Sequence, residues 1–129
     1  MATFRSFVEI EAWQKARELT GLVYVATRSA GFSKDFALRD QVRRASISIM
    51  ASIAEGFGRS GSVEFIQFLA VAKGSACEVI SHVVALDQGY VSQEEFDRLN
   101  SLAEKTVDLI GGPIRYLQKS SIKGAKYKR

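Results

Sequence analysis

The sequence contains very little cysteine, proline and histidine. Its one cysteine, Cys77, has no partner for a disulfide within the chain, which favours a reducing compartment. A single proline, Pro113, among 129 residues is typical of a protein built from long helices. One histidine, His82, and one thiol are too few for a cysteine-and-histidine metal site in one chain, so we expect no bound metal.

The N-terminus lacks a charged-then-apolar leader, and no unbroken apolar run approaches the roughly 20 residues that span a bilayer. Hydrophobic residues make up 47% of the chain and charged residues 25%, which is ordinary for a soluble protein. A length of 129 residues is enough for one domain with a real core. We therefore expect a soluble, cytoplasmic protein with no membrane partner.

Motifs for catalysis are also missing. A lone histidine on a helix is more often a packed or surface residue than a ligand. The segment Gly56-Phe57-Gly58 lacks the preceding strand, the third glycine and the lysine of phosphate-binding loops, so it is interpreted as a helix end. Most carboxylates fall at helix starts or exposed positions. We expect a non-enzymatic protein with no cofactor and no small-molecule substrate.

The most informative stretch is RRASISIMASIAEGFGR, from Arg43 to Arg59, whose middle is almost entirely small or aliphatic. On a helix, one stripe of this region comprises Val42, Ala45, Ile49 and Ile53. Apolar residues outside that stripe are Ile47, Met50 and Ala54. A helix that is apolar on more than one side is covered on more than one side. We expect the chain itself to supply one cover and another subunit to supply the second.

Hydrophobic periodicity predicts four helices, over about residues 9–28, 33–55, 63–87 and from 92 onward. Ser33 or Asp35 is expected to cap the second helix, and Ser62 the third. Gly56 and Gly58 are expected to end the second helix in the left-handed conformation that glycine favours.

Ser92 and Glu95 form a capping box that starts the fourth helix. The segment Gly111-Gly112-Pro113 predicts a kink or break inside that helix. Short connections make successive helices antiparallel neighbours. The expected fold is all-α: an up-down-up-down four-helix bundle over residues 1–118, followed by a basic tail over residues 119–129.

The third helix also carries apolar residues away from its core stripe, including Val71. Together with the charged and small residues around the central stretch, they define a candidate oligomer interface: Arg44, Ile47, Ser48, Met50, Ala51, Glu55, Arg59, Ile66, Ile80 and Val84. Two roles remain open for Arg44 and Arg59. Their guanidinium groups match phosphate oxygens, but salt bridges to Glu55, Glu64 or Glu78 are the favoured interpretation.

The net charge of +4 is unevenly distributed, because the chain has only basic charged residues from Arg115 to its end and the remainder is slightly acidic. A basic tail attracts polyanions, although it also serves simply as a solubilising end. Arg43 points away from its neighbour Arg44 and is expected to make an exposed contact. Candidate nucleic-acid-binding residues are Arg43, Lys119, Lys123, Lys126, Lys128 and Arg129. Core or interface roles are favoured over base stacking for Trp13 and Tyr24.

Several segments resemble the four-helix-bundle family of 23S rRNA intervening-sequence proteins. The likeness spans about residues 7 to 118. The segments that carry it are AWQKA at 12–16, QVRRASISI at 41–49, IAEGFGR at 53–59, Glu64-Phe65, Phe68-Leu69 and Lys73-Gly74-Ser75-Ala76. The family usually has proline at the position of Met50 and asparagine at that of Ser52. Gly111-Gly112-Pro113 is also unusual for its last helix.

The resemblance implies a four-helix bundle that assembles into a ring-like homopentamer. Members of the family were noticed as products of insertions in bacterial 23S rRNA genes. A related branch, the accessory variability protein of diversity-generating retroelements, is a basic pentameric barrel that binds a reverse transcriptase and nucleic acid. Two hypotheses follow: an RNA-binding homo-oligomer, or a protein-interaction scaffold such as an accessory subunit of a reverse transcriptase.

Overall fold

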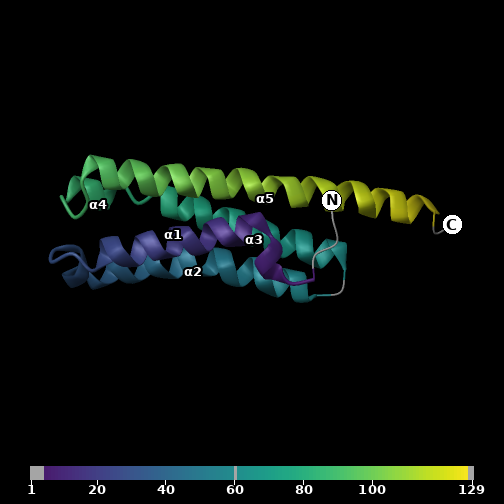
Figure 1. The fold of residues 1–129 in the computed structure, drawn as a ribbon, viewed down its shortest axis with the longest axis horizontal. Coiled ribbons are helices and arrows are strands. Elements are labelled where there is room, and N and C mark those ends of the chain that lie inside the picture. Colours follow the sequence, from purple (N-terminus) through teal and green to yellow (C-terminus); the bar gives the residue numbers. More distant parts are fainter. Residues whose placement is uncertain (1–4, 60, 128–129) are drawn as a thin grey trace.

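Four long helices make up most of the chain in the computed structural model, which describes residues 5–59 and 61–127 but not the side chains of residues 120–127. The long helices are α1 (Glu11–Thr27), α2 (Phe36–Gly58), α3 (Ser62–Ile80) and α5 (Gln93–Tyr127) (Figure 1). Shorter elements are the 3-10 turns η1 (Phe7–Glu9) and η2 (Phe32–Lys34) and the one-turn helix α4 (Val84–Asp87). No strand occurs in the described ranges. The all-helical prediction is confirmed.

The long helices pack in a ring of neighbours around one core. Helix α1 contacts α2, α2 contacts α3, α3 contacts α5, and α5 returns to contact α1. Each helix contributes fully buried apolar residues, and the largest of these are Leu19, Ile49, Ile53, Leu69 and Ile110. Burying such side chains stabilises the fold by roughly 1.5–3 kcal/mol each. The expected core stripe of α2 is therefore observed.

Helix α2 begins as expected and ends differently. The Asp35 carboxylate accepts a hydrogen bond of 3.2 Å from the backbone N–H of Leu38, which caps the helix. At the other end, neither Gly56 nor Gly58 has a positive φ, so the predicted glycine termination is wrong. The helix includes both glycines and stops where Arg59 adopts an extended conformation. Gly56 instead packs directly against α3.

The third helix is shorter than predicted. Helix α3 ends at Ile80 rather than near Asp87, and Ser62 is its first residue instead of its cap. The Ser81 hydroxyl donates to the Glu78 carbonyl at 2.7 Å, a local bond that competes with continuation of the helix. After this interruption α4 adds one turn, and Gly89, with φ of 74°, reverses the chain into α5.

Helix α5 begins with the predicted capping box. The backbone N–H of Ser92 donates to the Glu95 carboxylate at 3.0 Å, and the N–H of Glu95 donates to the Ser92 hydroxyl at 3.1 Å. The helix then continues unbroken past Pro113, contrary to the predicted break. Ile110 is fully buried and Ile114 packs on the core, so contacts on both sides of the proline hold the helix in place.

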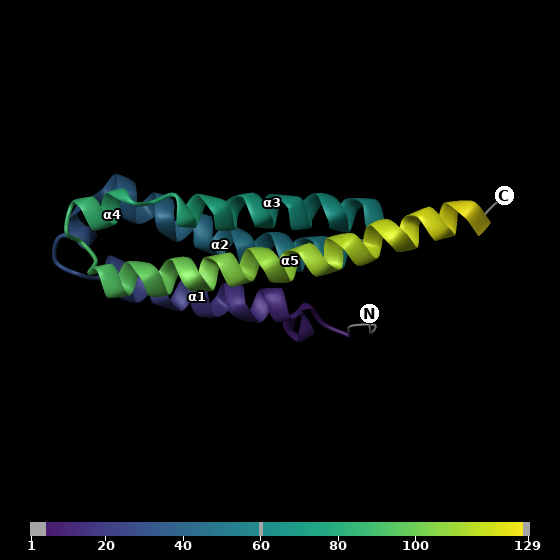
Figure 2. The ribbon, with the colours of Figure 1, turned by 90° about the horizontal axis from the view of Figure 1, so that it is seen from above.

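The final turns of α5 extend past the ends of the other helices (Figure 2). The helix runs through residues 118 and 119, where the sequence suggested a boundary between bundle and tail, and ends at Tyr127. The α1–α2 connection lies at the opposite end of the bundle (Figure 1). The α1–α2 connection and the final turns of α5 are thus widely separated.

One stretch is more apolar than the sequence pattern suggested. The sequence has no unbroken apolar run of about 20 residues, but when occasional charges are tolerated, Ser62–Asp87 is long and apolar enough to cross a membrane by length and composition alone. Core helices of soluble proteins also meet this criterion, and α3 packs against both α2 and α5. However, only 28% of the most apolar 18-residue segment within Ser62–Asp87 is buried. Helix α3 therefore presents considerable apolar surface on the outside of a single chain.

Candidate functional site

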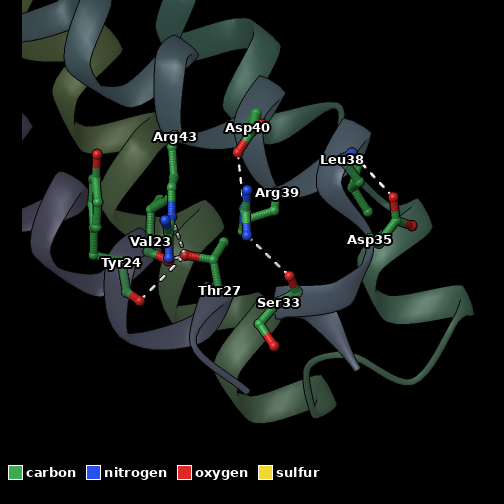
Figure 3. A network of polar contacts seen from close by, with 9 residues as sticks. All are labelled: Val23, Tyr24, Thr27, Ser33, Asp35, Leu38, Arg39, Asp40 and Arg43. Atoms are coloured by element: carbon green, nitrogen blue, oxygen red, sulfur yellow. Dashed lines mark hydrogen bonds and ion pairs between the residues drawn. The ribbon is translucent and has the colours of Figure 1, made fainter. Parts of the chain in front are cut away.

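Arg43 lies in the seam between α1 and α2. Its Nε donates a hydrogen bond of 2.8 Å to the Thr27 hydroxyl, and its guanidinium lies 4.5 Å from the centre of the Tyr24 ring (Figure 3). Thr27 is completely buried and donates to the Val23 carbonyl at 2.7 Å, so its oxygen is oriented to accept from Arg43. The expectation of a freely exposed Arg43 is wrong, because α1 supplies both an acceptor and an aromatic face.

Arg39, one helical turn before Arg43, is also held in place. It donates through Nη1 to the Ser33 carbonyl at 3.0 Å and through Nε to the Asp40 carboxylate at 2.8 Å (Figure 3). The hydrogen bond from Arg39 lowers the pKa of Asp40 below its usual value, with smaller contributions from other nearby arginines. The guanidinium also lies 4.9 Å from the centre of the Phe36 ring, which is 64% exposed.

Sequence reasoning considered Arg43 and Tyr24 but missed Phe36 and Arg39. Phe36, Arg39 and Arg43 recur at the spacing of one helix face, and that spacing is the signal that could have identified them. Arg43 also contacts Tyr24 on α1, and Arg28, four residues after Tyr24, is the residue that caps the end of α1. The structure thus brings two arginine–aromatic pairs together at one corner of the bundle.

The basic tail is described mainly through its backbone. Lys119 is exposed on α5. The side chains of Lys123 and Lys126, and all of Lys128 and Arg129, lie outside the described residues. The helical backbone nevertheless carries the chain through Lys126. Arg43 lies in the first half of α2, which begins at the α1–α2 connection, and this connection is at the end of the bundle opposite the final turns of α5 (Figure 1).

The candidate interface residues are distributed over several faces. The exposed members are Arg44, Ile47, Ala51, Glu55, Arg59 and Val84. Partly buried members are Ser48, Met50, Ile66 and Ile80.

Two partly buried members face different neighbours inside the same chain. The hydroxyl oxygens of Ser48 and Ser75 lie 2.9 Å apart in the α2–α3 seam. Met50 accepts a hydrogen bond from Thr20 on α1 at 3.4 Å. These two contacts help to hold the bundle together, so the exposed residues of α2 and α3 are the more direct candidates for contact with another subunit.

Arg59 forms the salt bridge favoured from the sequence. Its Nη2 lies 3.2 Å from the Glu55 carboxylate, one turn earlier in the chain. Its guanidinium also lies 5.4 Å from the Phe68 ring centre. An exposed ion pair of this kind contributes little to stability, typically below about 1 kcal/mol.

An open groove of about 470 Å³ lies between the start of α1 and the later part of α5. Its walls include Glu11, Asp108, Pro113, Arg115 and Tyr116, a mixture of both charge signs. Within the described part of the chain, no three histidine, cysteine or acidic side chains are placed to share a metal ion.

Comparisons with known proteins support the fold. A search of the curated proteins finds no match. A crystal structure from Bacteroides thetaiotaomicron VPI-5482, of a protein with unknown function from the S23 ribosomal protein family, superposes with a TM-score of 0.72. That protein is 22% identical in sequence, and the match covers 80% of this chain and 97% of that one. The likeness concerns the fold.

The sequence profile of one family covers most of the chain. The 23S rRNA-intervening sequence protein profile matches residues 8–112, which include α1, α2, α3 and α4 and more than half of α5. The matched region ends just before Pro113, so the projecting turns of α5 lie beyond it. The chain belongs to the family of 23S rRNA-intervening sequence proteins.

Proposed function

We propose that this protein is a non-enzymatic, cytoplasmic homo-oligomer that binds nucleic acid, with structured RNA as its ligand. The observation that carries the proposal is the projection of α5 beyond the bundle, where the sequence has basic but no acidic residues from Arg115 onward. Arg115, Lys119, Lys123 and Lys126 recur at intervals typical of one helix face. A projecting basic helix can approach phosphates without interference from the slightly acidic remainder of the chain.

A ring-like homopentamer is the proposed assembly. Its support comes from large apolar side chains exposed on α2 and α3: Ile47 is 43% exposed, Val71 54% and Val63 64%. Contiguous apolar surface on a water-soluble protein commonly marks a contact with another protein. A second copy covers the outer side of α2 and α3, while the core faces of the same helices remain inside the bundle.

Phosphate contacts give this binding a characteristic salt dependence. Each neutralised phosphate releases counterions, so the binding constant falls steeply as salt increases. Filter binding of a structured RNA by the full chain and by a protein ending at Leu117 tests the proposal. A full-length variant with Lys119, Lys123 and Lys126 changed to glutamine keeps the helix and removes only charge. Weaker and less salt-sensitive binding by both altered forms is expected.

Equal, salt-insensitive retention of all three forms would contradict the nucleic-acid proposal. The second candidate function is a protein-interaction scaffold, such as an accessory subunit of a reverse transcriptase. The large exposed apolar surface of α3 favours it, because such a surface fits a protein partner. Unchanged RNA binding after Lys-to-Gln substitution, together with loss of partner capture in a Val71→Asp variant, would favour the scaffold.

A further inference from the structure

We propose that the corner between α1 and α2 binds a single-stranded segment of nucleic acid through aromatic stacking and phosphate contacts. This inference rests on the proposed nucleic-acid function but places a second contact far from the α5 tail. The α1–α2 corner is defined here as Tyr24, Arg28, Lys34, Phe36, Arg39 and Arg43.

The charge of the corner is predominantly positive. Its basic residues are accompanied by two carboxylates, Asp35 and Asp40, and both are already engaged within the chain. Asp35 accepts from the backbone N–H of Leu38 and from the Tyr90 hydroxyl, at 3.2 and 3.1 Å. Asp40 accepts from Arg39. Arg28 and Lys34 are exposed, so their charges are available to phosphates arriving from solvent.

The aromatic residues supply a different kind of contact. Phe36 is 64% exposed, so most of its side chain lies outside the core. Nucleic-acid bases stack on such rings regardless of sequence, and a cation beside the ring adds to the attraction. Arg39 lies over Phe36 and Arg43 lies over the half-buried Tyr24, so each ring already carries a guanidinium.

The two guanidinium groups are positioned before any ligand arrives. The Ser33 carbonyl and the Asp40 carboxylate hold Arg39, and the buried Thr27 hydroxyl holds Arg43 (Figure 3). Fixed side chains lose less conformational freedom on binding than free ones, which favours affinity. Arg43 therefore acts here as part of a rigid surface rather than as the free exposed arginine expected from the sequence.

These features favour a single strand over the other polyanions. In a duplex the base faces are stacked inside the helix and cannot reach an exposed phenylalanine ring, whereas single-stranded bases can. An acidic protein would use the charges but would gain no base stacking from Phe36. The phenylalanine is therefore the residue that distinguishes these ligands.

Fluorescence anisotropy with a labelled oligouridylate, using the full chain, tests the corner directly. Phe36→Leu keeps an apolar side chain and removes the ring; we expect it to weaken binding by about tenfold. Val8→Ala, at an exposed apolar residue of η1 that belongs neither to the corner nor to the proposed subunit contact, is the control and should bind normally. Circular dichroism of each variant establishes that the fold is retained.

A second pair of variants separates charge at the corner from charge elsewhere. Arg28→Gln with Lys34→Gln should reduce the slope of log K against log salt by roughly 1.4 for a single strand, since each phosphate contact contributes about 0.7. Lys73→Gln with Lys105→Gln removes the same charge from exposed sites on α3 and α5 and should alter the slope much less. Equal effects of the two pairs would overturn the proposed site.

The outcomes also distinguish this inference from the function on which it rests. If the full chain binds no nucleic acid, the proposed function fails. If it binds oligouridylate but Phe36→Leu matches Val8→Ala, only the α1–α2 corner is rejected. If polyglutamate displaces the labelled oligouridylate as well as unlabelled oligouridylate does, and if Phe36→Leu leaves polyglutamate binding unchanged, the corner is instead a binding surface for an acidic protein. Binding that survives truncation at Leu117 and is weakened by Phe36→Leu supports the corner.

Discussion

Gly56 on α2 lies directly against Phe68 on α3. A Cβ atom placed on Gly56 would be 2.6 Å from the Cβ of Phe68 and 3.0 Å from a ring carbon of Phe65. The contact involves the base of the Phe68 side chain, which cannot swing away without movement of the α3 backbone. The absence of a side chain at Gly56 therefore allows the two helices to approach closely beside their connection.

Gly56→Ala should lower the free energy of unfolding by about 1–3 kcal/mol, because overpacking outweighs the better helix propensity of alanine. Urea denaturation followed by circular dichroism measures the change. Gly58→Ala is the matched control: a Cβ there meets nothing within 4 Å, and stability should stay the same or rise slightly. Equal stabilities for the two variants would show that the helices move apart freely.

The exposed apolar surface of α2 can be tested through the oligomeric state. Ile47 is 43% exposed, so Ile47→Asp should leave the fold intact and yield a smaller species in sedimentation velocity. Ile80 packs against the core, and Ile80→Asp should instead destabilise the bundle itself, by about 2 kcal/mol or more. An unchanged mass for Ile47→Asp would remove that face of α2 from the subunit contact.

The capping box at the start of α5 makes a local contribution to stability. Ser92→Ala removes the acceptor for the Glu95 N–H and should cost about 1 kcal/mol of unfolding free energy. Ser101→Ala, on the exposed middle of the same helix, removes no cap and should be nearly neutral. Urea denaturation of the two variants measures the difference in unfolding free energy. If Ser92→Ala does not change this free energy, tertiary packing alone determines where α5 begins.

His82 predicts a pH dependence of stability. Its Nε2 is buried and meets no hydrogen-bond partner in the described part of the protein. Burial lowers the pKa of His82 from 6.5, and the nearby Glu78 carboxylate opposes the effect. The unfolded chain therefore takes up a proton near pH 6.5, whereas the folded chain does so only at lower pH. Between those values the unfolded state holds more protons, and stability falls as the pH decreases.

Urea denaturation at pH 7.5 and pH 5.5 measures this loss. In a His82→Gln variant the group no longer titrates, so the difference in unfolding free energy between the two pH values should be smaller than in the unaltered protein. Titration of the carboxylates contributes to the pH dependence of stability in both proteins, so it cancels when the two are compared. An identical pH dependence in the two proteins would rule out His82 as its source.

Much of the fold could be predicted from periodicity and end signals. The stripe containing Ile49 and Ile53 identified the core face of α2, and the Ser92–Glu95 pair located the start of α5. Both features are local, because they depend on side chains a few residues apart. The end of α3 was misplaced because the apolar pattern continues through Val83 and Val84, both 47% exposed, although the helix has already stopped at Ile80.

The candidate site was harder to predict, since it depends on contacts across helices. Nothing near Arg43 in the sequence reveals that Thr27 and Tyr24, on the preceding helix, hold its side chain. The same holds for Ser48, whose hydroxyl meets Ser75 on α3. A polar residue beside an apolar stripe can face either solvent or a neighbouring helix, and the sequence alone does not distinguish the two.

The length of α5 has a consequence for any closed ring built from this chain. In a ring whose symmetry axis runs along the helices, copies related by rotation all point the same way, so the final turns of every α5 lie on one rim and every α1–α2 connection lies on the other. The two openings of such a ring would differ. One would carry the basic segments of α5, and the other would carry the aromatic side chains of Phe36 and Tyr24 with the arginines that lie over them. A nucleic acid that contacted both openings would bind different side chains at each, so it would bind the assembly in a preferred orientation.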